Sequence, residues 1–466
     1  MPDENLVYAS VGELASWLRA RKISSVELTT LFLNRLEKLG PRYNALAELT
    51  PELALRQARR ADRAIREGKV VSPLHGVPYG AKDLLATKNI PTRWGAPPYR
   101  NQVFDHDATV IRRLREAGAV LVGKLALIEL AGGGLYRYPS ASLNGPGLNP
   151  WNIKHWAGGS SSGSGSAVAG GLVPCALGSD TAGSIVAPSA YCGITGLRPT
   201  WGLVSRYGAM ELAWSMDTIG PMGRSAEDCG HMLQAMAGYD VHDISTIEHH
   251  FQFRSSGRKK EFHLGVLALD YTSQPETEKV FETALGVLRK AGMKVTQAKL
   301  PDYPYADIVM TVLHGEAVGV HEELIKSEKL NELVDEGQKV ALRGYLSMSI
   351  AEYSRAQKQR TQAALAVLDL FRKFDALVAP TLASEAVTID TDLSAQPRAR
   401  LSYMALGALA GVPCLSVPMG FGAHGLPLGL LIIGNRFAEN TILQIGTIFQ
   451  RETDWHLMRP AETVGA

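Results

Sequence analysis

The sequence has 466 residues, of which 45% are hydrophobic and 20% are charged, and its formal net charge at pH 7 is +2. This composition is typical of a globular protein, and the length suffices for one large core or for two domains. A net charge so close to zero gives no field that would attract nucleic acid or an anionic membrane, so neither is expected as a partner.

The cysteines and the N-terminus indicate a reducing compartment. Residues 1–5 lack the basic region and the apolar run of a signal peptide. Residues 404–434 carry no charge but are rich in Gly and Pro, which predicts buried strands and turns rather than a membrane helix. No Cys-x-x-Cys pair occurs, so we expect free, buried thiols and a cytoplasmic location. The four cysteines are Cys175, Cys192, Cys229 and Cys414.

Helices are predicted at the start of the chain. Ser10-Val-Gly-Glu13 and Ser24-Ser-Val-Glu27 are capping boxes, each of which marks a helix N-terminus. The second helix should stop at Gly40-Pro41, because glycine ends helices and proline cannot continue them. A third helix is expected to begin at Thr50-Pro51 and to end near Gly68.

Strands and helices alternate after these helices. Residues 74–82 predict a short buried strand, and Asp107 is expected to cap a helix that ends at Gly118. The apolar residues 119–124 predict the next strand. Such alternation indicates an α/β sandwich.

Nine consecutive residues, 158–166, are only Gly or Ser. Runs of this kind are usually flexible linkers. Here, however, the small and apolar residues 167–177 follow directly and predict a tightly packed helix leading into a short buried strand. A linker would not lead straight into the core, so we interpret the run as part of a site.

Two known glycine motifs do not fit this run, and a third fits only in its spacing. The phosphate-binding loop needs a Lys-Ser or Lys-Thr after its last glycine, and the dinucleotide motif needs Gly-x-Gly-x-x-Gly; neither spacing occurs. Gly159-Ser-Ser161-Ser-Gly163 does match the Gly-x-Ser-x-Gly elbow of α/β-hydrolases. The preceding residues 151–156 do not read as the buried strand that an elbow requires.

The second half of the chain continues the alternation. Residues 239–261 are polar and predict a solvated surface loop, with too few basic residues and no interleaved aromatics for a nucleic-acid patch. A strand at 262–269, a helix at 275–291 and a strand at 293–300 form a βαβ-like unit. A long helix at 351–374 should lead into a strand at 375–380.

A hydroxyl nucleophile needs a base, and a lysine can be that base only when burial lowers its pKa from about 10.4. Lys82 follows an apolar strand, which makes it a candidate. The other interpretation is a surface lysine paired with Asp83, and spacing alone does not decide between the two.

The Gly/Ser run and its surroundings resemble the amidase signature family of hydrolases. Gly158-Gly-Ser-Ser161 and Gly178-Ser-Asp-Thr-Ala-Gly-Ser184 match two parts of the family motif. Gly76-Val-Pro-Tyr-Gly-Ala-Lys-Asp83 matches its upstream Gly-Val-Pro-x-x-x-Lys-Asp. The remaining matches are Pro188, Cys192-Gly193, Gly196-Leu-Arg-Pro-Thr200 and the weaker Gly411-Val-Pro-Cys-Leu-Ser-Val-Pro418.

This resemblance implies a fold and a domain organisation. The expected fold is an α/β/α sandwich around a large mixed β-sheet, formed by a single amidase domain over residues 1–466. The family core would occupy residues 60–235 and 400–460. The substrate-lining regions would be variable, at about residues 125–155 and within about 240–400, where the family signal fades.

The resemblance also implies a role for each motif residue. Ser184 matches the nucleophile, Ser160 the serine held by a cis peptide bond, and Lys82 the base that Ser160 connects to the nucleophile. Asp180 and Ser161 are expected to support these residues through hydrogen bonds. No metal or cofactor is implied, and the histidines lack a ligand spacing such as His-Glu-x-x-His. The backbone N–H groups that match the oxyanion hole belong to Thr181, Ala182, Gly183 and Ser184.

Three departures from the family pattern bear on the substrate. Many members have Gly at Ala182 and Arg at Val186, and glutamine-using relatives have an acidic residue where this chain has Leu401. These changes favour a small-molecule substrate that is a neutral amide, anilide or carbamate (urethane), with esters as a further class. The implied reaction passes through an acyl-enzyme on Ser184.

Two alternatives stay open at the level of sequence. The chain could be the amidase subunit of a glutamine-dependent tRNA amidotransferase, which shares the same motifs. It could also be a catalytically silent binding protein on the same fold. Whether the chain forms a homo-oligomer is not decided by its sequence.

Overall fold

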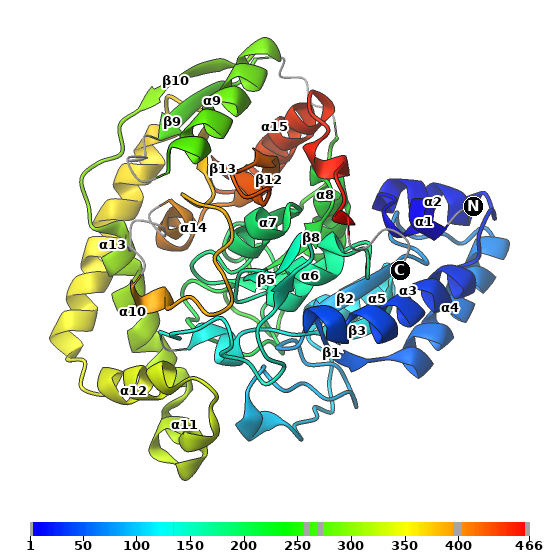
Figure 1. Ribbon diagram of the computed structural model, residues 1–466, viewed down its shortest axis with the longest axis horizontal. Coiled ribbons are helices and arrows are strands. Elements are labelled where there is room, and N and C mark those ends of the chain that lie inside the picture. Colours follow the sequence, from blue (N-terminus) through cyan, green and yellow to red (C-terminus); the bar gives the residue numbers. More distant parts are fainter. Residues whose placement is uncertain (1–2, 134, 256–260, 268–273, 396–402, 462–466) are drawn as a thin grey trace.

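The computed structural model describes residues 3–133, 135–255, 261–267, 274–395 and 403–461 (Figure 1). Near its start, the predicted capping boxes are confirmed. Helices α2 (Val11–Arg19) and α3 (Ser25–Leu39) have Ser10 and Ser24 as N-caps, and in each box the glutamate carboxylate accepts from the N–H of the serine. These helices are preceded by α1 (Asp3–Val7) and followed by α4 (Pro51–Arg66).

An 11-stranded mixed sheet runs through the molecule, as the resemblance implies. Strand β2 is parallel to its neighbours β3 and β6, and β9 is parallel to β10 and β11. The other neighbouring pairs are antiparallel. From one edge to the other, the strands are β1 (Leu46–Leu49), β3 (Val120–Leu125), β2 (Pro78–Lys82), β6 (Ala176–Asp180), β8 (Thr218–Gly223), β7 (Thr195–Arg198), β12 (Cys414–Phe421), β13 (Pro427–Gly434), β11 (Ala376–Pro380), β9 (His263–Leu267) and β10 (Lys294–Ala298).

Helices cover both faces of this sheet. Successive side chains of a strand point to opposite faces, and β12 shows the result. Leu415 and Val417 lie against Gly446 of α15, whereas Ser416 lies on the other face with Ala190 of α7. Helix α8 packs on β7 and β8, and α6 packs on β2 and β6. The helices of these layers also include α5 (Thr109–Glu116), α6 (Ser162–Ala169), α7 (Val186–Cys192), α8 (Ala226–Met236), α9 (Pro275–Lys290) and α15 (Glu439–Arg451).

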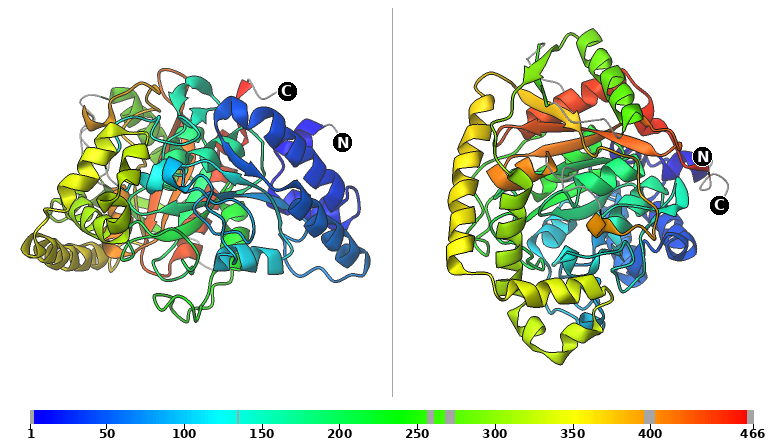
Figure 2. Two further views of the ribbon diagram at one scale, coloured as in Figure 1. Left: turned by 90° about the horizontal axis from the view of Figure 1, so that it is seen from below. Right: turned by 60° about the vertical axis from the view of Figure 1, so that its left-hand side comes forward.

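A group of helices from the second half of the chain forms a cap beside the sheet. Helices α10 and α13 pack against each other and against α14, and α12 packs on α10. Figure 2 shows the yellow helices of this cap along one side of the molecule in its right-hand view. The cap consists of α10 (Tyr305–Val320), α11 (Glu322–Lys326), α12 (Glu336–Tyr345), α13 (Ile350–Leu370) and α14 (Met404–Ala410).

Several shorter elements complete the chain. A separate two-stranded sheet is formed by β4 (Leu148–Asn149) and β5 (Asn152–Trp156). The four cysteines are free and buried, as expected. The 3-10 helices of the described residues are η1 (Pro41–Tyr43), η2 (Pro97–Tyr99), η3 (Glu129–Gly132), η4 (Glu328–Glu332), η5 (Leu393–Ala395) and η7 (Trp455–Leu457).

Two sequence predictions about helix starts are wrong. Asp107 is not a helix cap: α5 has Ala108 at its N-cap, because the Asp107 carboxylate is taken by the N–H of Lys88 and by Arg115. The helix predicted to follow the Gly/Ser run from residue 167 instead begins inside the run, because α6 starts at Ser162 and ends at Ala169. Close packing explains the glycine within this helix, since a Cβ on Gly163 would lie 2.5 Å from the backbone N of Ala126.

Two segments differ in part from their predictions. The uncharged residues 404–434 contain the predicted strands β12 and β13 but start with helix α14. In the described part of the chain, no helix is long and apolar enough to cross a membrane. The polar residues 239–255 form a loop, but Asp240 and Asp243 are buried in it, and the rest of that basic stretch, 256–260, lies outside the described residues.

Candidate active site

Lys82 is completely buried at the end of strand β2. Its Nζ atom lies 2.8 Å from the Oγ of Ser160 and 2.9 Å from the Oγ of Ser179. Burial lowers the pKa of Lys82 to about 7, although the carboxylates of Asp180 and Asp217 oppose this shift. Lys82 therefore has a large neutral fraction at neutral pH, and a neutral amine can accept a proton.

Asp83, the sequence neighbour of Lys82, pairs with a different lysine. Its Oδ1 atom lies 3.1 Å from the Nζ of Lys124, and both side chains are buried. Its Oδ2 atom accepts from the N–H of Arg93 at 2.9 Å. The interpretation of Lys82 as a surface lysine paired with Asp83 is therefore wrong.

Ser160 lies in a tightly packed turn before α6. The peptide bond between Gly159 and Ser160 is cis, in agreement with the resemblance. Gly158 has a φ of +84°, and a Cβ at this position would lie 2.7 Å from the Cα of Pro188. A Cβ on Gly159 would lie 2.7 Å from the Cζ2 of Trp156. Pro188 and Trp156 lie so close to the backbone at these two positions that only glycine fits.

The loop that carries Ser184 is held by the carboxylate of Asp180. Oδ1 accepts from the N–H of Gly183 and Oδ2 from the N–H of Ile185, both at 2.8 Å. Arg198 donates to Oδ1 at 2.9 Å and to the backbone carbonyl of Asp180 at 2.6 Å. Asp180 therefore supports the loop, as the sequence predicts for this residue.

One of the N–H groups predicted for the oxyanion hole is engaged elsewhere. The N–H of Gly183 donates to Asp180, because this carboxylate closes the turn from inside. In the described part of the chain, no residue accepts a hydrogen bond from the N–H of Ala182 or of Ser184. These two N–H groups are candidates to bind an oxyanion. The N–H of Thr181 stays a predicted third candidate.

Ser184 opens onto a cavity of about 400 Å³. Its side chain is half-buried, and its hydroxyl has no hydrogen-bond partner among the described residues. Most of the rest of the lining comes from the motif turns, the cap helices and the two regions predicted to line the substrate. Besides Ser184, the lining residues are Ala131, Gly132, Leu135, Tyr136, Trp156, Gly158, Gly159, Thr181, Ala182, Gly183, Ala187, Tyr191, Leu212, Met310, Leu313, Leu382, Leu393, Ser394 and Met404.

Ser161 holds Ser179, the residue whose hydroxyl is hydrogen-bonded to Lys82. Its Oγ donates to the carbonyl of Ser179 at 3.2 Å and accepts from the N–H of Ser179 at 3.4 Å. Ser161 itself is completely buried. The strand before it, β5, belongs to the small two-stranded sheet and is largely exposed. Ser161 is therefore not the exposed nucleophile of an α/β-hydrolase elbow.

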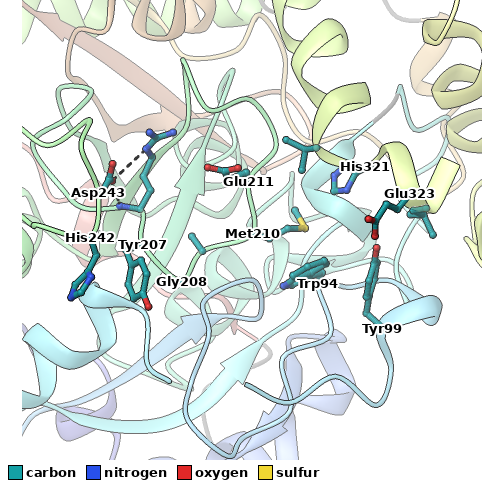
Figure 3. A pocket seen from close by; sticks show the side chains of 14 residues that line it. Trp94, Tyr99, Tyr207, Gly208, Met210, Glu211, His242, Asp243, His321 and Glu323 are labelled. Carbon is teal, nitrogen blue, oxygen red and sulfur yellow. Dashed lines mark hydrogen bonds and ion pairs between the residues drawn. The ribbon is translucent and has the colours of Figure 1, made fainter. Parts of the chain in front are cut away.

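A second cleft, of about 550 Å³, contains none of the predicted catalytic residues. Figure 3 shows Tyr207 and His242 on one side of this cleft and Trp94 and Tyr99 on the other. The dashed line in the figure marks the ion pair that Asp243 makes with Arg206, at 3.7 Å. Arg206, which lines this cleft, also acts on Asp217. Burial raises the pKa of Asp217, and the charge of Arg206 opposes that shift.

Sequence reasoning missed three residues of the site. Ser179 and Arg198 lie inside the quoted motifs, but the residues themselves give no sign that one binds Lys82 and the other Asp180. Asp217 lies outside the motifs and accepts a hydrogen bond from the Thr181 hydroxyl at 2.7 Å. Strand pairing, which places Asp180 opposite Thr218, is what brings Asp217 to this position.

One of the departures from the family pattern lies at the cavity, since Ala182 lines it. Val186 is buried, and its N–H donates to Asp180 Oδ2 at 3.4 Å. No cationic side chain therefore replaces the arginine of other family members at residue 186. Leu401 lies outside the described residues.

Comparisons with known proteins agree with this geometry. The family model described as Amidase matches residues 27–443. A protein of Nitrosospira multiformis that is named as a subunit of glutamyl-tRNA(Gln) amidotransferase is 36% identical over 493 residues, which cover 98% of this chain and 100% of that protein. The protein of the same name from a Roseiflexus species is 37% identical over 469 residues, covering 94% and 95%.

A solved structure is similar over the same length. The peptide amidase in complex with the competitive inhibitor chymostatin superposes with a TM-score of 0.85 and 32% identity, covering 97% of this chain and 98% of that one. The fold and the site thus define an enzyme that hydrolyses amide C–N bonds. The chain belongs to the amidase family.

Proposed function

We propose that this enzyme hydrolyses neutral amides, anilides or carbamates through an acyl-enzyme on Ser184. The observation that carries the proposal is the 2.8 Å hydrogen bond between the buried Nζ of Lys82 and the Oγ of Ser160, next to a cavity that Ser184 lines. A lysine whose pKa is about 7 can act as a general base at neutral pH. This arrangement supports the predicted roles of the three residues.

In the first step, the Ser184 oxygen attacks the carbonyl carbon of the substrate. Its proton passes to Ser160, whose own proton passes to Lys82. The N–H groups of Ala182 and Ser184 stabilise the negative charge on the tetrahedral oxygen. When the C–N bond breaks, the proton on Lys82 returns through Ser160 to the leaving amine.

In the second step, water attacks the acyl group on Ser184. The water gives one proton to Lys82 through Ser160, and that proton returns to the Ser184 oxygen as the acid leaves. With a carbamate, Ser184 is carbamylated or carries an alkyl carbonate, depending on which bond breaks. Release of carbonic species then reports the reaction.

The cavity supports a neutral substrate. None of the described residues that line it carries a formal charge, and most are aliphatic or aromatic. An ammonium group buried without a partner in such a site would cost several kcal/mol. Apolar acyl and amine groups gain on the order of 25 cal/mol for each Å² that they bury. Neutral anilides and aryl carbamates fit this lining better than a free amino acid does.

A second candidate function comes from the relatives. The proteins that are 36% and 37% identical are both named as a glutamyl-tRNA(Gln) amidotransferase subunit. The alternative is thus a protein that releases ammonia from glutamine inside a complex. The described residues that line the cavity are uncharged, which speaks against a site for the glutamine zwitterion.

A direct comparison of substrates separates the two functions. Glutamine, a neutral anilide and an aryl carbamate are supplied at equal concentration, with Ser184→Ala as the control for background hydrolysis. We expect the anilide or the carbamate to be cleaved fastest. Glutamine as the best substrate, or activity only after partner subunits are added, would favour the amidotransferase alternative.

A further inference from the structure

Asp217 joins parts of the site that are distant in sequence. Its Oδ1 atom accepts from the hydroxyl of Thr181 at 2.7 Å, and its Oδ2 atom accepts from the N–H groups of Leu212 and Ala213 at 2.8 and 2.9 Å. Thr181 begins the loop that carries Ser184, and Leu212 lines the cavity. Both carboxylate oxygens are therefore committed, and they fix the loop relative to the cavity lining.

Sheet register explains why Asp217 occupies this place. Strands β6 and β8 are antiparallel, with Asp180 opposite Thr218. One residue further on, the same register brings Thr181 next to Asp217 where the two strands end. The contact thus directly adjoins two adjacent strands of the central sheet, which hold it more precisely than two free loops would.

The carboxylate of Asp217 also acts on Lys82 through its charge. The charged groups at Lys82 are Asp180 and Asp217, and both favour its protonated form. Its other neighbours, Ser160 and Ser179, are uncharged hydroxyls.

These two carboxylates differ in their own partners. Asp180 forms a buried ion pair with Arg198 at 2.9 Å, which offsets its charge. Among the described residues, Asp217 is hydrogen-bonded only to neutral groups, and the charge of Arg206 also acts on it. Burial raises the pKa of Asp217 to about 6, so it is ionised at pH 7 and above.

We propose that Asp217 is a positioning residue that holds Thr181 and the Ser184 loop against the cavity lining at Leu212. The inference rests on the proposed function, because it takes Ser184 as the nucleophile and Lys82 as its base. None of the family motifs in the sequence includes Asp217.

An Asp217→Asn change separates the effects of position and charge. The amide keeps the size of the side chain but has only one oxygen, so either Thr181 or the N–H groups of Leu212 and Ala213 lose their acceptor. Loss of the negative charge lowers the pKa of Lys82. The variant should therefore react more slowly at its plateau, and its pH dependence should move to lower pH.

The reaction of Ser184 with a fluorophosphonate, followed by intact mass against pH, measures both effects without an amide substrate. For Asp217→Asn we expect a plateau rate about tenfold lower and a midpoint lower by about 0.5–1 pH unit. Thr181→Val removes the hydroxyl but keeps the charge, so only its plateau rate should fall. Asp240→Asn is the matched control, because Asp240 is also buried and accepts from the Ser205 hydroxyl at 2.6 Å, and it should behave as wild type.

Each outcome decides a separate point. An unshifted midpoint for folded Asp217→Asn overturns the charge effect, and a wild-type plateau rate for Thr181→Val overturns the positioning role. If Asp217→Asn does not fold, the Thr181→Val rate decides alone. Absence of labelling at Ser184 in the wild-type protein contradicts the proposed function itself.

Discussion

Arg198 and Asp180 form an ion pair in the interior of the protein, with Nη1 of the arginine 2.9 Å from Oδ1 of the aspartate and both side chains buried. The aspartate uses its two oxygens to close the loop around Ser184, and the arginine also donates to the carbonyls of Asp180 and Met216. A charge pair that would otherwise be costly to bury therefore organises the backbone around the predicted nucleophile.

Removal of Arg198 should destabilise the protein strongly. Arg198→Met leaves Asp180 buried without its countercharge, which costs about 3–5 kcal/mol in comparable cases. The free energy of unfolding by urea measures this loss. Arg112→Met is the control, since its pair with Glu116 is exposed and should contribute less than about 0.5 kcal/mol. Equal losses in the two variants would contradict the organising role of Arg198.

Lys82→Met should abolish activity and yet stabilise the fold. Without its base, the enzyme should lose on the order of 10⁴-fold in kcat. Ser160→Ala should lose less, because a water molecule can take the place of the relay hydroxyl. More than a tenth of wild-type activity in Lys82→Met would contradict the assignment of the base.

The stability effect follows from the lowered pKa of Lys82, which is about 7 in the folded protein and 10.5 as its ordinary value. Below pH 7 the lysine is charged in both states, and the folded protein carries the full cost of burying that charge. Between pH 7 and 10.5 the folded protein has released a proton that the unfolded chain retains, so stability rises with pH. Methionine lacks this cost. We expect a gain of about 1–4 kcal/mol at pH 7 that shrinks toward pH 10, measured by urea unfolding.

The same pKa predicts the pH profile of the reaction. The value of kcat/KM should rise with a midpoint near pH 7, as Lys82 loses its proton, and should stay high in the alkaline range. Glu129 needs a control, because burial raises its pKa to about 7 as well. Glu129→Gln should keep the midpoint. A maximum below about pH 6 would contradict a lysine base.

The sequence predicts helices and strands whose signals are local, whereas the mixed sheet was expected from the family resemblance. Capping boxes depend on residues three apart, and the strand–helix–strand unit between residues 262 and 300 depends on its own periodicity; the structure has both. The start of helix α6 within the Gly/Ser run was missed for the opposite reason. The eight residues of this helix have no apolar stripe, and the need for a glycine such as Gly163 comes from close packing against distant backbone at Ala126.

The site was predictable only where the family motif supplies it. Lys82, Ser160 and Ser184 were found through motif positions, and the structure places Lys82 and Ser160 in contact. The role of Asp217 depends on the register of two antiparallel strands, which no local pattern encodes. The engagement of the Gly183 N–H by Asp180 likewise depends on the conformation of one turn.

The central claim is that Ser184 forms a covalent acyl-enzyme with a neutral substrate. Mass spectrometry of the protein, quenched during turnover of a neutral anilide or aryl carbamate and then digested, tests it most directly. We predict a mass increase equal to the acyl or carbamoyl group on the peptide that contains Ser184, and none in Ser184→Ala. An adduct on Ser161 or on any other residue, or turnover by Ser184→Ala at the wild-type rate, would contradict the account.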